Sequence, residues 1–150
     1  MSRAGFHPRF RTDLFRSEAD RPRSEQGLRI LLGALVELDR LYLAAHPQTP
    51  TLYAAGVRYR AEPPGQEEWL DVPHALAAGH RGAPLDCEDL AAWRVAELRN
   101  AGIDARPIFR ARRLPGKWVY HILVGLPDGT TEDPSRRLGM GRNREWGGVG

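Results

Sequence analysis

The chain has 150 residues, a net charge of +3 at neutral pH, and 41% hydrophobic and 27% charged residues. This length suits one domain with its own core, and the composition is typical of a soluble globular protein. No apolar run is long enough to span a bilayer, and the arginine-rich N-terminus lacks the apolar segment of a secretory signal. We therefore expect no membrane partner.

The use of cysteine and arginine indicates the cellular compartment and the kind of partner. Cys87 is the single cysteine, so the fold cannot depend on an intramolecular disulfide. All basic residues but Lys117 are arginines, yet no basic run is interleaved with aromatic residues as nucleic-acid binding requires. We expect a cytoplasmic protein, or one enclosed in a phage or virion-like assembly, without nucleic acid as a partner.

The N-terminal third contains one clear helical pattern. Residues 1–26 are charged and weakly patterned, and we expect an arm with a short helix over residues 12–19. Residues 27–45 have apolar positions at helical spacing, and His46-Pro47 marks the end of this predicted helix. The stripe expected to be buried comprises Ile30, Leu31, Ala34, Leu35, Leu38, Leu41 and Tyr42.

Residues 56–61 alternate apolar and polar side chains, which predicts a half-exposed edge strand. A loop with one short helical turn is expected over residues 67–84.

A second helix is predicted to begin beside the cysteine. Asp86 is a good N-cap, Asp89 follows three residues later, and Gly102 supplies a C-terminal stop near residue 100. Cys87 shares one helix face with Ala91, Val95 and Leu98, so the thiol belongs to the end of a core-facing stripe.

Two strands, residues 106–112 and 117–125, follow around a turn. Both faces of the second are mostly apolar, so it should be buried on both sides, with His121 interrupting one face. Pro127-Asp128-Gly129 suits a bulged three-residue loop, which makes Asp133 the diagonal, same-face neighbour of His121. A two-residue loop would send Asp133 to the opposite face.

A cysteine at a helix N-terminus, a histidine on one strand and an aspartate on the next is an arrangement typical of a thiol hydrolase or acyltransferase. Asp86, Glu88 and Asp89 oppose ionisation of the thiol, so His121 must activate it. We expect the Cys87 sulfur about 3.5–4 Å from one ring nitrogen of His121, and Asp133 against the other.

Each residue also has a purely structural interpretation. Cys87 alone reads as a small buried hydrophobe, His121 as a satisfied core histidine and Asp133 as a turn or cap residue. Zinc ligation by Cys87, His121, Asp133 and His80 would lack any pair of close ligands on one element. We therefore expect neither a cofactor nor a metal.

Residues 82–140 resemble the transglutaminase-like superfamily, the bacterial thiol proteases and acyltransferases related in fold to papain. The matching segments are Asp86-Cys87-Glu88-Asp89, the stretch AGIDARP at 101–107, Tyr120-His121 and Glu132-Asp133-Pro134. The resemblance implies an α+β, papain-like fold with the Cys-bearing helix packed on an antiparallel sheet and an extra N-terminal helix. It implies Cys87 as nucleophile, His121 as general base and Asp133 as orienting acid, acting on protein or peptide amides.

This sequence departs from the family where His121 is followed by Ile122-Leu123 in place of the frequent alanine-tryptophan step. The alternative is therefore a catalytically idle structural or adaptor subunit, for instance in a phage particle. We expect the transglutaminase-like domain to span 27–135, with its core motifs in 82–135. The Gly- and Arg-rich tail 136–150, with Trp146, is expected to dock on another protein.

Overall fold

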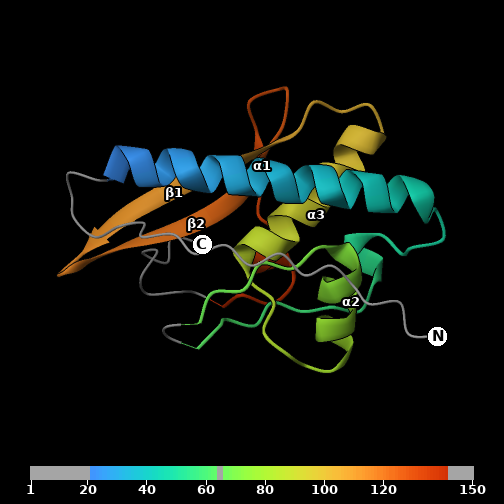
Figure 1. Cartoon of the computed structure of the whole chain (residues 1–150), viewed down its shortest axis with the longest axis horizontal. Coiled ribbons are helices and arrows are strands. Elements are labelled where there is room, and N and C mark those ends of the chain that lie inside the picture. The colour runs from blue at the N-terminus through green and yellow to red at the C-terminus, as the bar shows by residue number, and fades with distance from the viewer. Residues whose placement is uncertain (1–20, 64–65, 142–150) are drawn as a thin grey trace. The chain divides into compact units, whose positions relative to one another are not determined.

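The computed structural model describes residues 21–63 and 66–141 (Figure 1). In chain order the elements are α1 (Arg21–Ala45), the 3₁₀ turn η2 (Leu52–Ala54), α2 (Val72–His80), α3 (Cys87–Asn100), β1 (Arg106–Leu114), β2 (Lys117–Gly125), β3 (Thr131–Glu132) and α4 (Pro134–Arg137). The strands form an antiparallel sheet in the order β1-β2-β3. The α+β class is thus confirmed. None of the helices in this described part has the length and apolarity that crossing a membrane requires.

The chain divides into two compact units, Met1–Leu31 and Leu32–Gly150. Helix α1 begins in the first unit and ends in the second, and every later element belongs to the second unit. The short helix expected over residues 12–19 lies outside the described residues.

Both ends of α3 are set by local sequence. At its start the Asp89 carboxylate accepts from the backbone N–H of Asp86 at 3.2 Å, as in a capping box. At its end Gly102 adopts φ +82°, and the Ile103 N–H donates to the Leu98 carbonyl at 2.9 Å. This is a Schellman ending, and it places the end of the helix at the stop predicted from Gly102.

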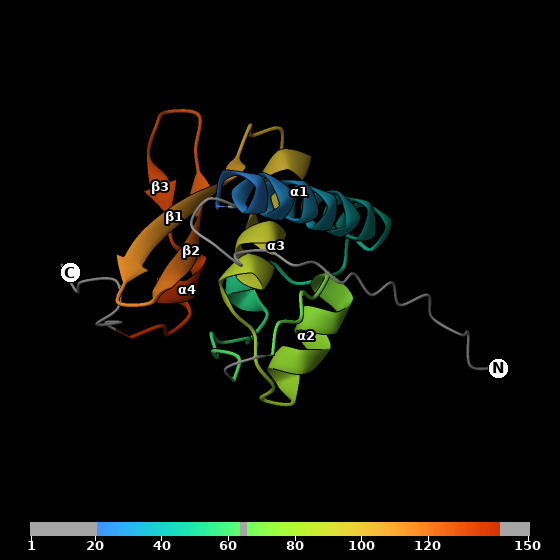
Figure 2. The ribbon, with the colours of Figure 1, turned by 60° about the vertical axis from the view of Figure 1, so that its left-hand side comes forward.

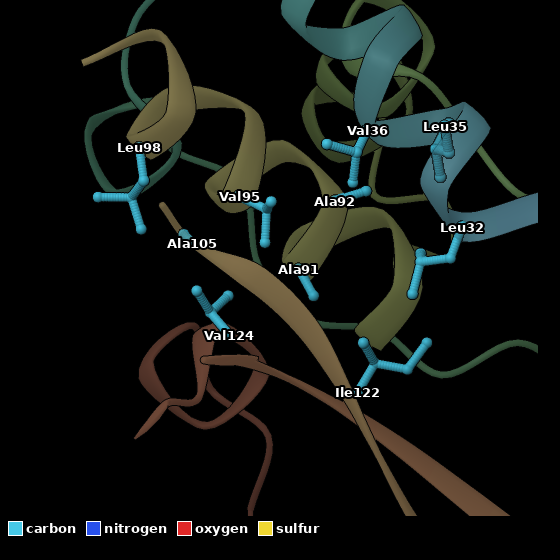
Figure 3. Packing of buried hydrophobic residues seen from close by; sticks show 10 residues of the cluster. All are labelled: Leu32, Leu35, Val36, Ala91, Ala92, Val95, Leu98, Ala105, Ile122 and Val124. Carbon is cyan, nitrogen blue, oxygen red and sulfur yellow. The ribbon is translucent and has the colours of Figure 1, made fainter. Parts of the chain in front are cut away.

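Helix α3 packs on the sheet through small side chains. Ala91, Ala92 and Val95 are fully buried, and Figure 3 shows Ile122 and Val124 of β2 pointing toward them. Cys87 is packed against the same cluster. Alanines let the helix approach the strand closely, so the start of α3 comes within reach of β2.

The buried face of α1 differs from the predicted stripe. Leu32, Leu35 and Val36 are buried against α3, whereas Leu38 is 54% and Leu41 69% exposed. Apolar residues occur all round this helix, so their spacing did not single out one face. The true face also contains an acidic residue, Asp39, which is fully buried and accepts from the Val72 N–H at the start of α2 at 2.8 Å.

The edge strand predicted over residues 56–61 is not formed. This segment makes a single bridge, in which Arg60 and Leu85 exchange two backbone hydrogen bonds of 2.8 Å. The expected helical turn is instead the nine-residue α2. A Cβ on Gly79 would lie 2.3 Å from Val57, so α2 packs directly against this segment and position 79 admits no side chain unless Val57 shifts.

A short loop joins β2 to β3 (Figure 2), and it is the predicted bulged loop. The Leu126 N–H donates to the Thr130 carbonyl at 2.9 Å, and Gly129 takes φ +84°. Val124 therefore pairs with Glu132. Continued by one residue, this register places Asp133 on the face of His121, as the loop chemistry predicted.

Candidate active site

His121 and Asp133 form a hydrogen-bonded pair. The His121 side chain is buried, and its Nε2 lies 2.9 Å from Asp133 Oδ2. Asp133 is also the N-cap of α4, where Oδ1 accepts from the Arg136 N–H at 3.2 Å. The corner between β3 and α4 thus aims one carboxylate oxygen at the ring and the other at the helix.

Asp133 is ionised at neutral pH. Burial acts to raise its pKa, but the hydrogen bond and charge of His121 outweigh it, so the pKa of Asp133 lies below its ordinary value. An ionised carboxylate accepts hydrogen bonds only, so Nε2 of His121 carries the proton. In a neutral ring, Nδ1 is then the atom that can accept a proton from a nucleophile.

Cys87 is the first residue of α3, and its thiol donates a hydrogen bond to the carboxylate of the next residue, Glu88. The sulfur lies 3.4 Å from Glu88 Oε2. Burial raises the pKa of Cys87 to about 12, the negative charge of Asp86 adds to the rise, and the backbone N–H of Ile122 partly offsets it. In this geometry the thiol is protonated.

The backbone of β2 explains why the thiol meets Ile122. The Leu126 N–H points toward β3, and every second residue of an antiparallel ladder points the same way, so the Ile122 N–H does too. Strand β3 ends at Glu132, before the position opposite Ile122. This N–H is therefore available to the Cys87 sulfur.

The structure brings Asp133 to His121, and it brings Cys87 to the next residue of the same strand. Ile122 points toward α3, so alternation along β2 directs His121 to the other face. Within the described residues the hydrogen bond of Cys87 goes to Glu88 and not to the imidazole, where we expected it.

Four carboxyl groups surround the start of α3. One oxygen each from Glu62, Asp86, Glu88 and Asp89 lies within 4.8 Å of the others. Burial is the largest cause that raises the pKa of all four, and the charges of neighbouring acids add to it; for Glu62 the pKa is about 7. Glu88 and Asp89 are only 4% and 1% exposed. Such a cluster is neutralised either by protons or by a cation.

The donor set decides which cation would fit. The four groups offer only oxygen atoms, which suits Ca²⁺ or Mg²⁺ and not Zn²⁺. The zinc ligands considered from the sequence are not assembled among the described residues, because His121 holds Asp133 and His80 Nε2 lies 3.1 Å from the Ala55 carbonyl. Asp89 also has a structural role, since Oδ1 accepts from the Leu70 N–H at 2.7 Å.

Sequence reasoning missed two parts of this site. Glu62 comes near Asp86 because the antiparallel Arg60–Leu85 bridge joins the two segments that carry them, and no local pattern signals that bridge. Glu132 was noted only as part of a motif, yet its carboxylate contacts Arg94 of α3 at 3.0 Å. The acid spacing in Asp86–Asp89 was visible, but its burial was not.

Comparison with known proteins found no relative: the sequence matches no family model, and no match was found among curated proteins or solved structures. The functional argument therefore rests on the residues and their geometry.

Proposed function

We propose that this protein is a thiol-dependent amide hydrolase or acyltransferase of the transglutaminase-like, papain-related type, acting on protein or peptide amides through Cys87, His121 and Asp133. The observation that carries the proposal is the His121–Asp133 pair at 2.9 Å, formed by the strand register that the loop chemistry requires. An ionised Asp133 on Nε2 leaves Nδ1 as the proton acceptor, which is the ring atom a nucleophile would use.

The start of α3 supports the second part of the proposal. Cys87 occupies the first position of the helix, where unpaired backbone N–H groups favour negative charge. The backbone N–H of Ile122, one residue from His121, acts to lower the pKa of the thiol. Catalysis requires the thiol to leave Glu88 and to meet the imidazole, which alternation along β2 directs to the other face of the strand.

The chemistry then follows from these three residues. His121 Nδ1 takes the thiol proton, and the thiolate attacks the carbonyl carbon of the amide. The imidazolium, held by Asp133, returns the proton to the departing amine as the carbon–nitrogen bond breaks and a thioester remains. Water or an amine attacks the thioester, giving an acid or a new amide, and His121 again accepts and returns the proton.

One observation favours the second candidate, a catalytically idle structural or adaptor subunit. The thiol donates to Glu88, and burial with the charge of Asp86 raises its pKa to about 12. A thiol held in this way is inert, which suits a core cysteine in an assembly protein. A binding partner would then be the functional ligand.

Covalent trapping distinguishes the two candidates. The protein is incubated with casein and a biotinylated amine, and peptides carrying Cys87 are analysed by mass spectrometry. We expect a hydroxylamine-sensitive acyl adduct on Cys87, with biotin transferred or casein cleaved, and loss of all three signals in Cys87→Ala. Turnover that persists in Cys87→Ala would refute the thiol mechanism, and a folded wild-type protein without adduct or turnover would favour the idle subunit.

A further inference from the structure

The carboxylate that orients His121 lies on a short piece of chain. Strand β3 makes two residue pairs with β2, Val124 with Glu132 and Gly125 with Thr131, and α4 is a single turn of four residues. Elements of this length have little stability of their own. Something else must therefore hold Asp133 at 2.9 Å from the ring.

The residue before Asp133 is anchored to α3. Glu132 Oε1 accepts from Arg94 Nε at 3.0 Å, from the Tyr53 hydroxyl, and from Arg137 Nη1 at 3.5 Å. The Glu132 side chain is only 15% exposed and that of Arg94 23%. Charge-assisted hydrogen bonds that are shielded from water in this way fix geometry more firmly than exposed ion pairs.

The anchor continues into neighbouring elements. Arg94 Nη1 lies 3.2 Å from Glu97 Oε2, and Glu97 Oε1 accepts from the Leu52 N–H at 2.6 Å. The guanidinium groups of Arg94 and Arg137 lie over the Tyr53 ring, at 5.1 and 4.0 Å from its centre. Burial and the bond to Glu132 raise the pKa of Tyr53, so its hydroxyl remains a donor.

Alternation along the chain connects this anchor to the site. Glu132 pairs with Val124, which faces α3, so its side chain faces α3 as well. Asp133, the next residue, points to the opposite face and to His121. Arg94 lies on the same helix that begins with Cys87, two turns further on. The contact between Glu132 and Arg94 therefore ties the position of Asp133 to α3, the helix that carries Cys87.

We propose that Glu132 is a positioning residue, which holds Asp133 against His121 by fixing the β3–α4 corner to Arg94 and Tyr53. This inference deepens the proposed function and rests on it for its catalytic meaning. The positioning itself is a property of the His121–Asp133 pair and is measured without turnover.

The test uses NMR of the full chain. Ring ¹⁵N shifts report which nitrogen of His121 carries the proton, and the carboxyl ¹³C shift reports ionisation of Asp133. We expect Glu132→Ala to weaken the preference for Nε2–H and to raise the pKa of Asp133 toward its ordinary value, and Tyr53→Phe, which removes one hydrogen bond, to do so in part. Glu37→Gln, which removes an exposed carboxylate that pairs with Arg40, is the matched control and should change neither.

Asp133→Ala shows the full effect of losing the carboxylate. If Glu132→Ala and Tyr53→Phe lower the melting temperature but leave the His121 tautomer and the Asp133 titration unchanged, the network is merely structural and the proposal is overturned. An unchanged tautomer in Asp133→Ala overturns it too, because Asp133 would not set the ring. Absence of turnover, by contrast, would refute the proposed function and leave these measurements intact.

Discussion

The groups around Cys87 have opposite effects on the ionisation of its thiol. The start of a helix and the Ile122 N–H favour the thiolate, whereas burial and the charges of Asp86 and Asp89 disfavour it. Burial dominates, and the pKa rises to about 12. The opposition from acids was predictable, because it comes from residues adjacent in sequence. The extent of burial was not, because it depends on packing against β2.

Substitution at Asp86 tests the electrostatic part of this balance. Asp86→Asn keeps a side chain that caps helices equally well but removes a negative charge beside the thiol. We expect the pKa of Cys87 to fall and its alkylation at pH 8 to accelerate, with little change in stability. Iodoacetamide labelling followed by intact mass measures the rate. Asp104→Asn, at an exposed position beyond the other end of α3, should not change it; equal rates in all three proteins would show that Asp86 is electrostatically unimportant.

At the scale of elements, local signals were sufficient where the chain itself sets the geometry. The caps of α3 and the bulged loop before β3 follow from Asp86, Gly102 and Gly129, so the register that joins His121 to Asp133 was predictable. The buried face of α1 was not, because apolar residues surround that helix and the buried position Asp39 is an acidic residue. Tertiary contacts with α2 and α3 determine which face of α1 is buried.

A matched pair of substitutions tests the corrected face of α1. Leu32 is fully buried against α3, and Leu38 is 54% exposed on the same helix. Leu32→Ala should lower the free energy of unfolding by about 2–5 kcal/mol, because it leaves a cavity. Leu38→Ala should change it by no more than about 0.5 kcal/mol. Urea denaturation measures both, and equal losses would contradict this assignment of the core.

For the molecule as a whole, buried acids should make stability fall as pH rises. Burial raises the pKa of Asp39 to about 8, and the pKa values of Glu88 and Asp89 are raised as well. Between the ordinary carboxyl range and these raised values the folded state binds more protons than the unfolded state. Stability therefore decreases with pH in that window. Asp133, with its lowered pKa, acts in the opposite sense at acid pH.

Asp39→Asn isolates one of these groups. The amide oxygen can still accept from the Val72 N–H, but the side chain no longer ionises. Relative to wild type, the variant should gain stability as pH rises from about 4 to 8, by at most about 1.4 kcal/mol per pH unit. Urea unfolding at pH 5 and pH 8 measures the difference. A difference that is the same at both values would show that Asp39 does not titrate in this window.

The expected docking of residues 136–150 stays a prediction, since residues 142–150 lie outside the described part of the chain. Arginine and tryptophan in this tail are typical interface residues. Deleting residues 142–150 should abolish assembly with a partner, measured by size-exclusion chromatography with light scattering of the native complex, and leave the labelling rate of Cys87 unchanged. Assembly that survives the deletion would locate the interface elsewhere.

The most direct test of the catalytic assignment is the pH dependence of Cys87 alkylation in wild type, His121→Gln and Asp133→Asn. If His121 activates the thiol, the wild-type rate should level off near neutral pH and exceed that of His121→Gln by about tenfold or more at pH 7, with Asp133→Asn in between. If all three proteins react alike, at a rate that rises tenfold per pH unit through pH 9, Cys87 is an inert buried thiol and the catalytic assignment is wrong.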